Sequence, residues 1–453
     1  MQLKLLFFLF SLFFKFLGTP EPQTAIILLQ NNHEIRATGG FMGSYAKLSG
    51  VQPQLGLNPS KFSLSLQDIY VPDGQIQGHV EPPAPIQQAF GQGWFRLRDA
   101  NWDPNFPTSA KTIRWFLEKG KEINPDVLIA INLSTIQKLL TLTGNVKGPT
   151  LDMNITADNI SLLLQNEIQE NFFPGSTNKK DLLTATNQAF MQKLSSLPLK
   201  QKIKIIQMIF SELKNQEILI NATDPKFQAW LEKKNWAGVL QPAPCTSKVH
   251  DCLSDTVAII ESNLGSNKAN AFITRHTTHK ITKGSSSDSV ASGDSSDVEP
   301  TYIHHQITIK YTNTSPSESP DPPNHHGGDY LNYLRLYIPT SATNIKMEGF
   351  SSDSGPQSSD RTSSDVKPVK ITTNHDFTEV GFFHTTPHQA TSSATISYQL
   401  PLRHPALDAG SISYQLTILK QPGITSSPQT INLFGKQQNL NLTTDFSQTS
   451  LIN

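Results

Sequence analysis

Five consecutive apolar residues, Ala25–Leu29, constrain the fold of this chain more than any other stretch of its 453 residues. An unbroken apolar run of this length predicts a strand that is buried on both faces of a sheet. The run ends in polar residues that include Asn32, Glu34 and Arg36, and Phe41–Leu48 is strand-like again. We therefore predict a hairpin whose buried first strand carries charged side chains to the edge of a sheet.

Two glycines, Gly39 and Gly40, occupy the predicted turn of this hairpin. Glycine lets the backbone approach a ligand closely, and it also allows the positive φ of a tight turn. The turn therefore fits two interpretations: a ligand-binding edge, or a hairpin with a solvated end.

A second apolar run, within Asp126–Ile131, predicts another buried strand. Helical patterns surround it, at Pro107–Gly120, Ser134–Gly144, Leu199–Lys214 and a segment that begins at Asp224-Pro225. The stretch 71–93, which is rich in Pro and Gly, predicts an irregular loop. Because buried strands alternate with helices, we predict an α/β domain over residues 21–282.

The pattern changes beyond a low-complexity stretch, which has too few apolar residues to pack and predicts a flexible linker over residues 283–300. Short strand-like runs then recur between Pro, Ser, Asn and Gly. Their spacing predicts an immunoglobulin-like β-sandwich over residues 301–453. Thr256–Ile260 and Ala271–Ile281 also have strand patterns, which either complete the first domain or lead to the second.

Residues 1–20 contain the apolar stretch Leu5–Phe14 between Lys4 and Lys15. A bilayer span takes about 20 residues, so this stretch is short for one, and its length is typical of a signal-peptide core. A cleaved signal, an anchor and an apolar docking helix all remain open. In each case we expect the protein to associate with a membrane.

The chain has 37 basic and 37 acidic residues, and this balance gives no overall electrostatic attraction to anionic lipid or to nucleic acid, so we predict no nucleic-acid partner. Its two cysteines, Cys245 and Cys252, fit a short-loop disulfide formed in an oxidising compartment, with two free thiols as the alternative. Their spacing is not that of a zinc knuckle. His304-His305 is predicted in or beside a loop, and His276 and His279, three apart on a strand, face opposite sides. We predict no metal site at these residues.

Charged and polar side chains recur where strands end or the chain is irregular, which is where α/β proteins build their sites. Converging guanidinium groups suit a phosphate or pyrophosphate, because they match paired oxygens. A neighbouring carboxylate can hold Mg²⁺ or orient an acceptor hydroxyl. We predict a catalytic set of Asp68, Arg98 and Asp99, and a ligand-binding set of Asn32, Glu34, Arg36 and Arg96.

The same residues also fit a purely structural role. Arg98 would then form an ion pair with Asp103, and Arg36 would pair with Glu34 or Asp99. Structural ion pairs are commoner than active sites. An apolar groove beside the arginines would favour a binding site, whereas guanidinium groups locked to carboxylates would favour the structural role.

Two blocks of sequence resemble a bacterial envelope family, domain-of-unknown-function family 4012. Leu28–Tyr45 is similar to the family's "LLLQNN-E-R-TGGF-GSY", and Leu97–Pro107 is similar to "RDANWSPDFP". Asn263–Arg275 and Lys420–Gly423 also fit. The resemblance implies an outward-facing envelope protein with an upstream membrane anchor, but no settled activity.

The order of elements also looks like that of the LytR–CpsA–Psr envelope phosphotransferases. Asp126–Gly144 followed by Asn145-Val146 is similar to that family's strand, helix and "DALGGV" element. Arg36-Ala37-Thr38 and Arg98-Asp99-Ala100 only approximate its "RSDT" and "PRDT" signatures. The resemblance implies that arginines hold a polyprenyl pyrophosphate and that an Asp holds magnesium.

Together these observations predict an outward-facing protein of the bacterial cell membrane. It would bind a phosphorylated envelope glycan or a polyprenyl-pyrophosphate-linked precursor, with phosphoryl or glycan transfer left open. The alternative is a non-catalytic surface protein with a structural or adhesive role.

Overall fold

The structure is a computed structural model, and it describes residues 24–49, 63–91, 93–147, 154–160, 189–190, 192–246, 252–285, 301–317, 326–349, 369–402 and 412–452. The chain forms two compact units, one made of most residues up to Leu240 and one of most residues from Gln241 onward. Residues 1–20, with their predicted apolar segment, lie outside the described ranges. Within those ranges, no helix combines the length and apolar character that crossing a bilayer requires.

The first unit is built on a five-stranded mixed sheet in the order β3-β2-β1-β4-β7. β1 pairs antiparallel with β2 and parallel with β4, in a register that runs from Ala25 opposite Val127 to Gln30 opposite Asn132. The predicted hairpin and both buried strands are confirmed, while β7 was not predicted. The strands are β1 (Thr24–Arg36), β2 (Gly39–Ser49), β3 (Ser63–Asp68), β4 (Val127–Asn132) and β7 (Ile218–Ala222).

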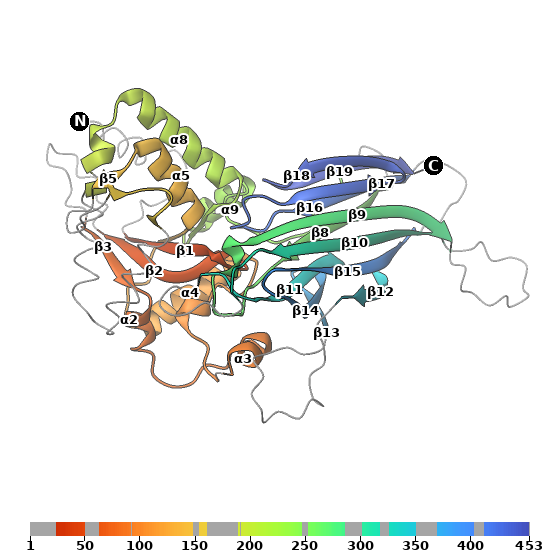
Figure 1. The fold of residues 1–453 in the computed structure, drawn as a ribbon, viewed down its shortest axis with the longest axis horizontal. Helices are drawn as coiled ribbons and strands as arrows, with labels where there is room; N and C mark the ends of the chain where they lie inside the picture. The colour runs from red at the N-terminus through yellow and green to blue at the C-terminus, as the bar shows by residue number, and fades with distance from the viewer. Residues whose placement is uncertain are drawn as a thin grey trace, which may run out of the picture. The chain divides into compact units, whose positions relative to one another are not determined.

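Helices cover both faces of this sheet (Figure 1). Successive residues of β1 point to opposite faces, so β1 presents apolar side chains to the helices on each face. Ile26 and Leu28 share a core with Phe116 of α4, whereas Ala25 shares one with Leu231 of α9. Two short helices, α2 and α3, lie in the stretch that was predicted as an irregular loop. The described helices of this part are α2 (Tyr70–Asp73), α3 (Ala84–Phe90), η1 (Leu97–Asp99), α4 (Phe106–Lys119), α5 (Leu133–Thr143), α8 (Leu199–Lys214) and α9 (Pro225–Lys233); β5 (Val146–Lys147) pairs with β6 (Asn154–Ile155).

The second unit consists of two six-stranded sheets, in the orders β12-β15-β10-β9-β17-β18 and β13-β14-β11-β8-β16-β19. Most neighbours are antiparallel, but β8 with β16 and β9 with β17 are parallel. The strands are β8 (Cys252–Ile260), β9 (Ile273–Ser285), β10 (Thr301–Asn313), β11 (Tyr330–Pro339), β12 (Thr343–Glu348), β13 (Val369–Asn374), β14 (Phe377–Thr386), β15 (Ala390–Pro401), β16 (Ile412–Leu419), β17 (Pro428–Leu433), β18 (Lys436–Asn441) and β19 (Phe446–Ile452); η2 spans Ala269–Ala271.

The division between the units falls at Leu240–Gln241 rather than near residue 282. The physical reason is that β8 and β9 are inner strands of the two sheets of the second unit. The predicted β-rich second part is confirmed. Its immunoglobulin-like topology stays a prediction. Each sheet contains one parallel pair of strands, whereas the sheets of immunoglobulin domains are antiparallel.

A disulfide joins Cys245 to Cys252, with their Cα atoms 6.2 Å apart, as the sequence predicted. The cysteine pair thus closes a short loop directly before β8. The histidine prediction needs one correction, because His304-His305 lies within β10 rather than beside a loop. His276 and His279 do face opposite sides of β9: His276 is exposed, whereas His279 is fully buried.

Candidate functional site

The hairpin of β1 and β2 is irregular at its end, and this irregularity positions Glu34 and Arg36. Pairing shifts between Asn31 and Ile35, so the chain bulges before the final pair, Arg36 opposite Gly39. A Cβ atom at Gly39, whose φ is +138°, would overlap the side chain of Asn132. The glycine is therefore required by a close approach within the protein itself.

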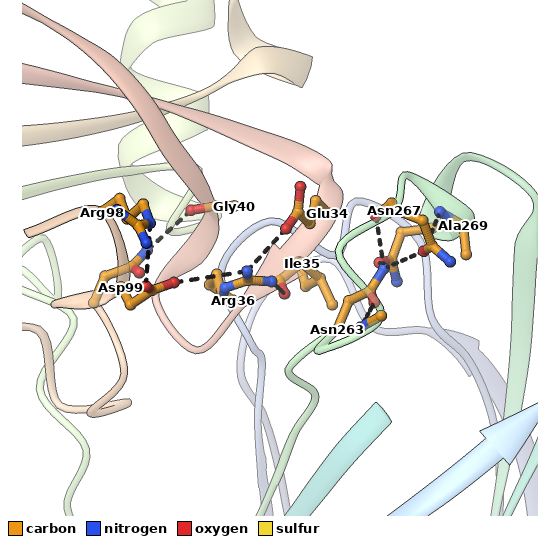
Figure 2. Close-up of polar contacts among 12 residues, drawn as sticks. Glu34, Ile35, Arg36, Gly40, Arg98, Asp99, Asn263, Asn267 and Ala269 are labelled. Atoms are coloured by element: carbon orange, nitrogen blue, oxygen red, sulfur yellow. Dashed lines mark hydrogen bonds and ion pairs between the residues drawn. The ribbon is translucent and has the colours of Figure 1, made fainter. Parts of the chain in front are cut away.

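Arg36 is buried, with only 3% of its side chain exposed, and it faces two carboxylates. Its Nη2 atom lies 2.8 Å from Oε1 of Glu34 and 3.9 Å from Oδ1 of Asp99. Its Nη1 atom donates to the Ile35 carbonyl at 3.3 Å, and its guanidinium carbon lies 5.4 Å from the ring centre of Phe41. Figure 2 shows the guanidinium group between the two acids.

Arg98 approaches the same aspartate from the other side (Figure 2). Its Nε atom lies 3.6 Å from Oδ2 of Asp99, and its Nη1 atom lies 3.2 Å from Oδ2 of Asp73. Asp73 is fixed in turn, because its Oδ1 accepts the backbone N–H of Leu97 at 2.7 Å. Arg98 is 23% exposed and lies over the ring of Tyr70 at 5.4 Å.

These residues form a continuous chain of alternating charge: Glu34, Arg36, Asp99, Arg98 and Asp73. We call it the arginine–carboxylate cluster. It contains three carboxylates and two guanidinium groups, so its formal charges sum to one negative charge.

Burial dominates the electrostatics of the cluster. It raises the pKa of Asp99, and the neighbouring Arg36 and Arg98 offset only part of that rise. Burial likewise raises the pKa of Asp73 against the opposing effect of Arg98. For Tyr70, burial raises the pKa to about 12. Burial thus removes hydration from both aspartates, and this loss offsets part of the electrostatic gain from their guanidinium partners.

The other predicted site residues make different contacts. Asp68 ends β3, where its Oδ1 accepts the backbone N–H of Tyr70 at 3.1 Å. The guanidinium carbon of Arg96 lies 4.8 Å from the ring centre of Trp94, which is half exposed. Asn32 accepts the backbone N–H of Ser134 at the start of α5. The structure therefore brings Glu34, Arg36, Arg98 and Asp99 together, and it gives Asp68, Arg96 and Asn32 other roles.

The sequence did not reveal the partner of Arg98. Arg98 is held by Asp73 and Asp99, whereas Asp103, the expected partner, accepts the backbone N–H of Asn105 at 2.8 Å. Asp73 lies 25 residues before Arg98 in a Pro- and Gly-rich segment. No local pattern links the two, so only the fold could identify this pair.

A second buried polar group lies at the carboxyl ends of the parallel strands β1 and β4, where α/β proteins commonly bind ligands. Asn132 Nδ2 and Ser134 Oγ both donate to Oε2 of Glu217, at 3.0 and 3.2 Å. Gln30 Nε2 donates to Oγ1 of Thr38 at 3.2 Å. Neither Asn132 nor Glu217 was among the predicted site residues; Asn132 could have been found as the first polar residue after an apolar run, whereas no local pattern marks Glu217.

The arginine–carboxylate cluster does not fit Mg²⁺. Hard cations need several oxygen ligands directed at one point, yet Glu34, Asp73 and Asp99 each direct an oxygen at a guanidinium group. Within the described part of the chain, no group of three or more His, Cys, Asp or Glu side chains could hold a metal ion. The predicted magnesium role of an Asp therefore has no donor set in this arrangement.

The cluster should stabilise the first unit, which the variant Asp99→Asn tests. The change removes the charge that both guanidinium groups share, and we expect a loss of about 2 kcal/mol in unfolding free energy. Urea unfolding followed by tryptophan fluorescence measures this loss, since all five tryptophans lie between residues 94 and 236.

The matched control is Glu81→Gln, which breaks an exposed pair with His79. Surface pairs of this kind contribute little, so its effect should stay below about 0.5 kcal/mol. Equal stability of Asp99→Asn and the control would show that the cluster does not brace the fold.

Comparison with solved structures finds weak similarities. Protein gbs0355 from Streptococcus agalactiae is 13% identical, with 48% of this chain and 74% of that chain covered and a TM-score of 0.31. Lin1025 from Listeria innocua is 11% identical, with 48% and 80% covered and a TM-score of 0.28. The transcriptional regulator yvhJ from Bacillus subtilis is 9% identical, with 50% and 84% covered and a TM-score of 0.24. Matches with TM-scores this low support no conclusion about activity.

A search of curated proteins gives no match to the chain. A family model does match the segment that contains both early sequence blocks and the whole arginine–carboxylate cluster. Asn263–Arg275 and Lys420–Gly423 lie outside the match. Over residues 20–168, the chain is similar to the family described as "Protein of unknown function (DUF4012)".

Proposed function

We propose that this is a non-catalytic, outward-facing protein of the bacterial cell envelope, with a structural or adhesive role. One observation carries the proposal: both guanidinium groups of the cluster converge on the same buried carboxylate, Asp99. Each also pairs with an acid of its own, Arg36 with Glu34 and Arg98 with Asp73. The cluster thus resembles a structural brace, by which we mean a set of buried ion pairs that holds neighbouring segments of the fold together.

Charge balance supports this proposal over phosphate transfer. A site for phosphate or pyrophosphate directs guanidinium N–H groups at the ligand and carries an excess of positive charge. The cluster has an excess of negative charge, and an incoming anion would have to displace a carboxylate. Transfer chemistry would in addition need a metal or a proton acceptor that is directed at the substrate.

The disulfide supports the proposed location. Disulfides persist in oxidising compartments, so Cys245–Cys252 fits an extracytoplasmic protein. The sequence blocks that resemble an envelope family, Leu28–Tyr45 and Leu97–Pro107, add an expectation of the same kind, whereas the family whose model matches residues 20–168 is described only as one of unknown function. We propose further that the first unit descends from a LytR–CpsA–Psr-like fold and that the second is an immunoglobulin-like sandwich.

A second candidate function keeps the ligand that the resemblance implied, a phosphorylated glycan or polyprenyl-pyrophosphate-linked precursor. The observation in its favour is the loose geometry around Asp99. Its contacts with the two arginines are 3.6 and 3.9 Å long, and its buried Oδ2 accepts no hydrogen bond in the described structure. A phosphate oxygen could take the place of this carboxylate beside Arg98, which is partly exposed.

Mass spectrometry of lipids that co-purify with the detergent-extracted protein separates the two functions. We expect wild type, Arg98→Ala and Arg96→Ala to recover the same small amount of polyprenyl-phosphate species. Arg96→Ala is the matched control, because its guanidinium group stacks on Trp94 instead of joining the cluster. Enrichment of such a species that Arg98→Ala loses and Arg96→Ala keeps would overturn the structural or adhesive role and support the second candidate, a ligand-binding function.

A further inference from the structure

We propose that α8 is a membrane-contact helix, which inserts an exposed apolar stripe into the surface of an anionic bilayer. The stripe repeats at intervals of four, three and four residues, so it follows one side of the helix over three turns. Its members are Leu199, Ile203, Ile206 and Phe210, which are 63%, 46%, 44% and 55% exposed.

The opposite side of α8 already holds the helix on the first unit. Ile205 and Glu212 are buried there, and the two carboxylate oxygens of Glu212 accept hydrogen bonds from Thr135 and Lys138 of α5, each at 2.8 Å. Leu213 follows Phe210 along the line of the stripe but is buried, so the exposed stripe ends at Phe210. α8 lies beside α5 in Figure 1. More than two fifths of each stripe side chain stays exposed after α8 has packed on the first unit, so this packing does not account for the stripe. Contiguous exposed apolar surface of this kind marks an interaction site.

Charge identifies the partner. The exposed charged residues of α8 are all lysines, namely Lys200, Lys204 and Lys214, and its one carboxylate, Glu212, is buried. Lysine can lay its aliphatic stem along the stripe and reach its ammonium group to a lipid phosphate. An apolar stripe with lysine beside it is typical of helices that lie in the bilayer interface. A second copy of the chain would bring the same positive charges together, which disfavours self-association.

Aromatic residues continue this surface from α8 toward α9. The ring of Phe210 lies 5.8 Å from that of Trp236, which lies 5.1 Å from that of Trp230. The Nζ atom of Lys234 lies 5.9 Å from the ring centre of Trp230. Tryptophan and lysine together are enriched at the level of the lipid headgroups. Both tryptophans are only partly exposed and also pack against the core that contains Phe227 and Leu231, so they border the stripe at its Phe210 end.

This inference concerns α8 and α9 and does not depend on the arginine–carboxylate cluster. It stands whether that cluster is a structural brace or binds a phosphorylated ligand, and its test does not use the cluster residues.

A local probe tests the proposal in the full chain. The variant Ile206→Cys provides one labelling site, because Cys245 and Cys252 are joined in a disulfide. An environment-sensitive fluorophore at this position should shift to the blue when vesicles of phosphatidylglycerol and phosphatidylcholine are added. Pure phosphatidylcholine should require at least about tenfold more lipid, since each lysine near an anionic surface contributes about 1 kcal/mol. The same probe in Ile371→Cys, at an exposed isoleucine on β13, is the matched control and should not respond.

The double variant Ile203→Glu with Ile206→Glu should weaken binding to anionic vesicles at least about tenfold, whereas Ile371→Glu should leave it unchanged. Because these side chains are exposed, both variants should melt at the wild-type temperature. A probe at residue 206 that stays solvated while the protein binds vesicles would refute the proposal. So would a blue shift that appears without lipid and grows with protein concentration, which would identify a second copy as the partner.

Discussion

Replacing Asp255 with asparagine is expected to destabilise the second unit by about 4 kcal/mol, the largest single effect that we predict. Removing this carboxylate takes an acceptor away from several buried donors at once, and each buried donor left without a partner costs about 1–3 kcal/mol. Asp255 lies in β8, is fully buried, and its Oδ2 is 2.7 Å from Nδ1 of His305 in β10. The pair therefore joins the two sheets through their shared core.

Two tyrosines complete the environment of Asp255. The hydroxyl of Tyr398 donates to Oδ1 at 2.7 Å, and that of Tyr414 donates to Oδ2 at 2.5 Å. Burial alone would raise the pKa of Asp255, but His305 and the two hydroxyls outweigh burial and lower it. Asparagine keeps the shape of the side chain but replaces one accepting oxygen with an NH₂ group. At least one buried donor would then lose its acceptor.

Hydrogen exchange of β8 and β10 in increasing urea measures this loss directly. Tryptophan fluorescence in the same samples gives an internal control, since every tryptophan precedes residue 241 and should report an unchanged first unit. The matched variant is Asp329→Asn, which alters a pair with His388 in which each side chain is 34% exposed, and it should cost less than about 1 kcal/mol. A cost for Asp255→Asn no larger than that of Asp329→Asn would contradict the prediction.

Features that depend on nearby residues could be predicted from the sequence. The apolar runs identified β1 and β4, and Asp224-Pro225 located the start of α9, where Asp224 Oδ1 accepts the backbone N–H of Phe227 at 2.8 Å. The short Cys245–Cys252 loop predicted its disulfide. In each case the residues concerned lie within a few positions of one another in the sequence, so the local sequence is enough to predict the feature.

Features that depend on distant residues could not be predicted in this way. The cluster joins Arg36 to Asp99, and the core of the second unit joins Asp255 to Tyr414, 159 residues later. We predicted that Arg36, Arg98 and Asp99 would lie near one another, but the sequence did not determine whether they would face a ligand or one another. That choice depends on Asp73, which no local pattern connects with Arg98.

The second large effect is a loss of stability in mild acid, and it depends on His279. This side chain lies fully buried between His305 and Gln429, with its Nδ1 atom 3.0 Å from Nε2 of His305 and its Nε2 atom 3.1 Å from Oε1 of Gln429. Burial, and next the charge of His305, lower the pKa of His279 to about 3, while Gln429 and Asp255 offset a smaller part. The folded protein therefore keeps this imidazole neutral well below neutral pH.

The sign of the effect follows from which state binds the proton. A histidine in the unfolded chain has a pKa of about 6.5, so below that pH the unfolded state gains a proton that folded His279 does not bind. Each pH unit should then cost about 1.4 kcal/mol, which gives about 3 kcal/mol between pH 6.5 and pH 4. Burial also lowers the pKa of His384, which adds a slope of the same sign.

Urea unfolding of the second unit at several pH values between 7.5 and 4 measures this slope. His279→Asn should reduce it by nearly one proton, even though the variant starts from a lower stability at neutral pH. His276→Gln is the matched control: it changes an exposed histidine on the other side of the same strand, whose Nε2 atom lies 3.0 Å from Oγ1 of Thr430. If His279→Asn retains the full wild-type slope, then the unfolded chain takes up its extra proton at some other residue, and the buried imidazole does not set the acid sensitivity of this unit.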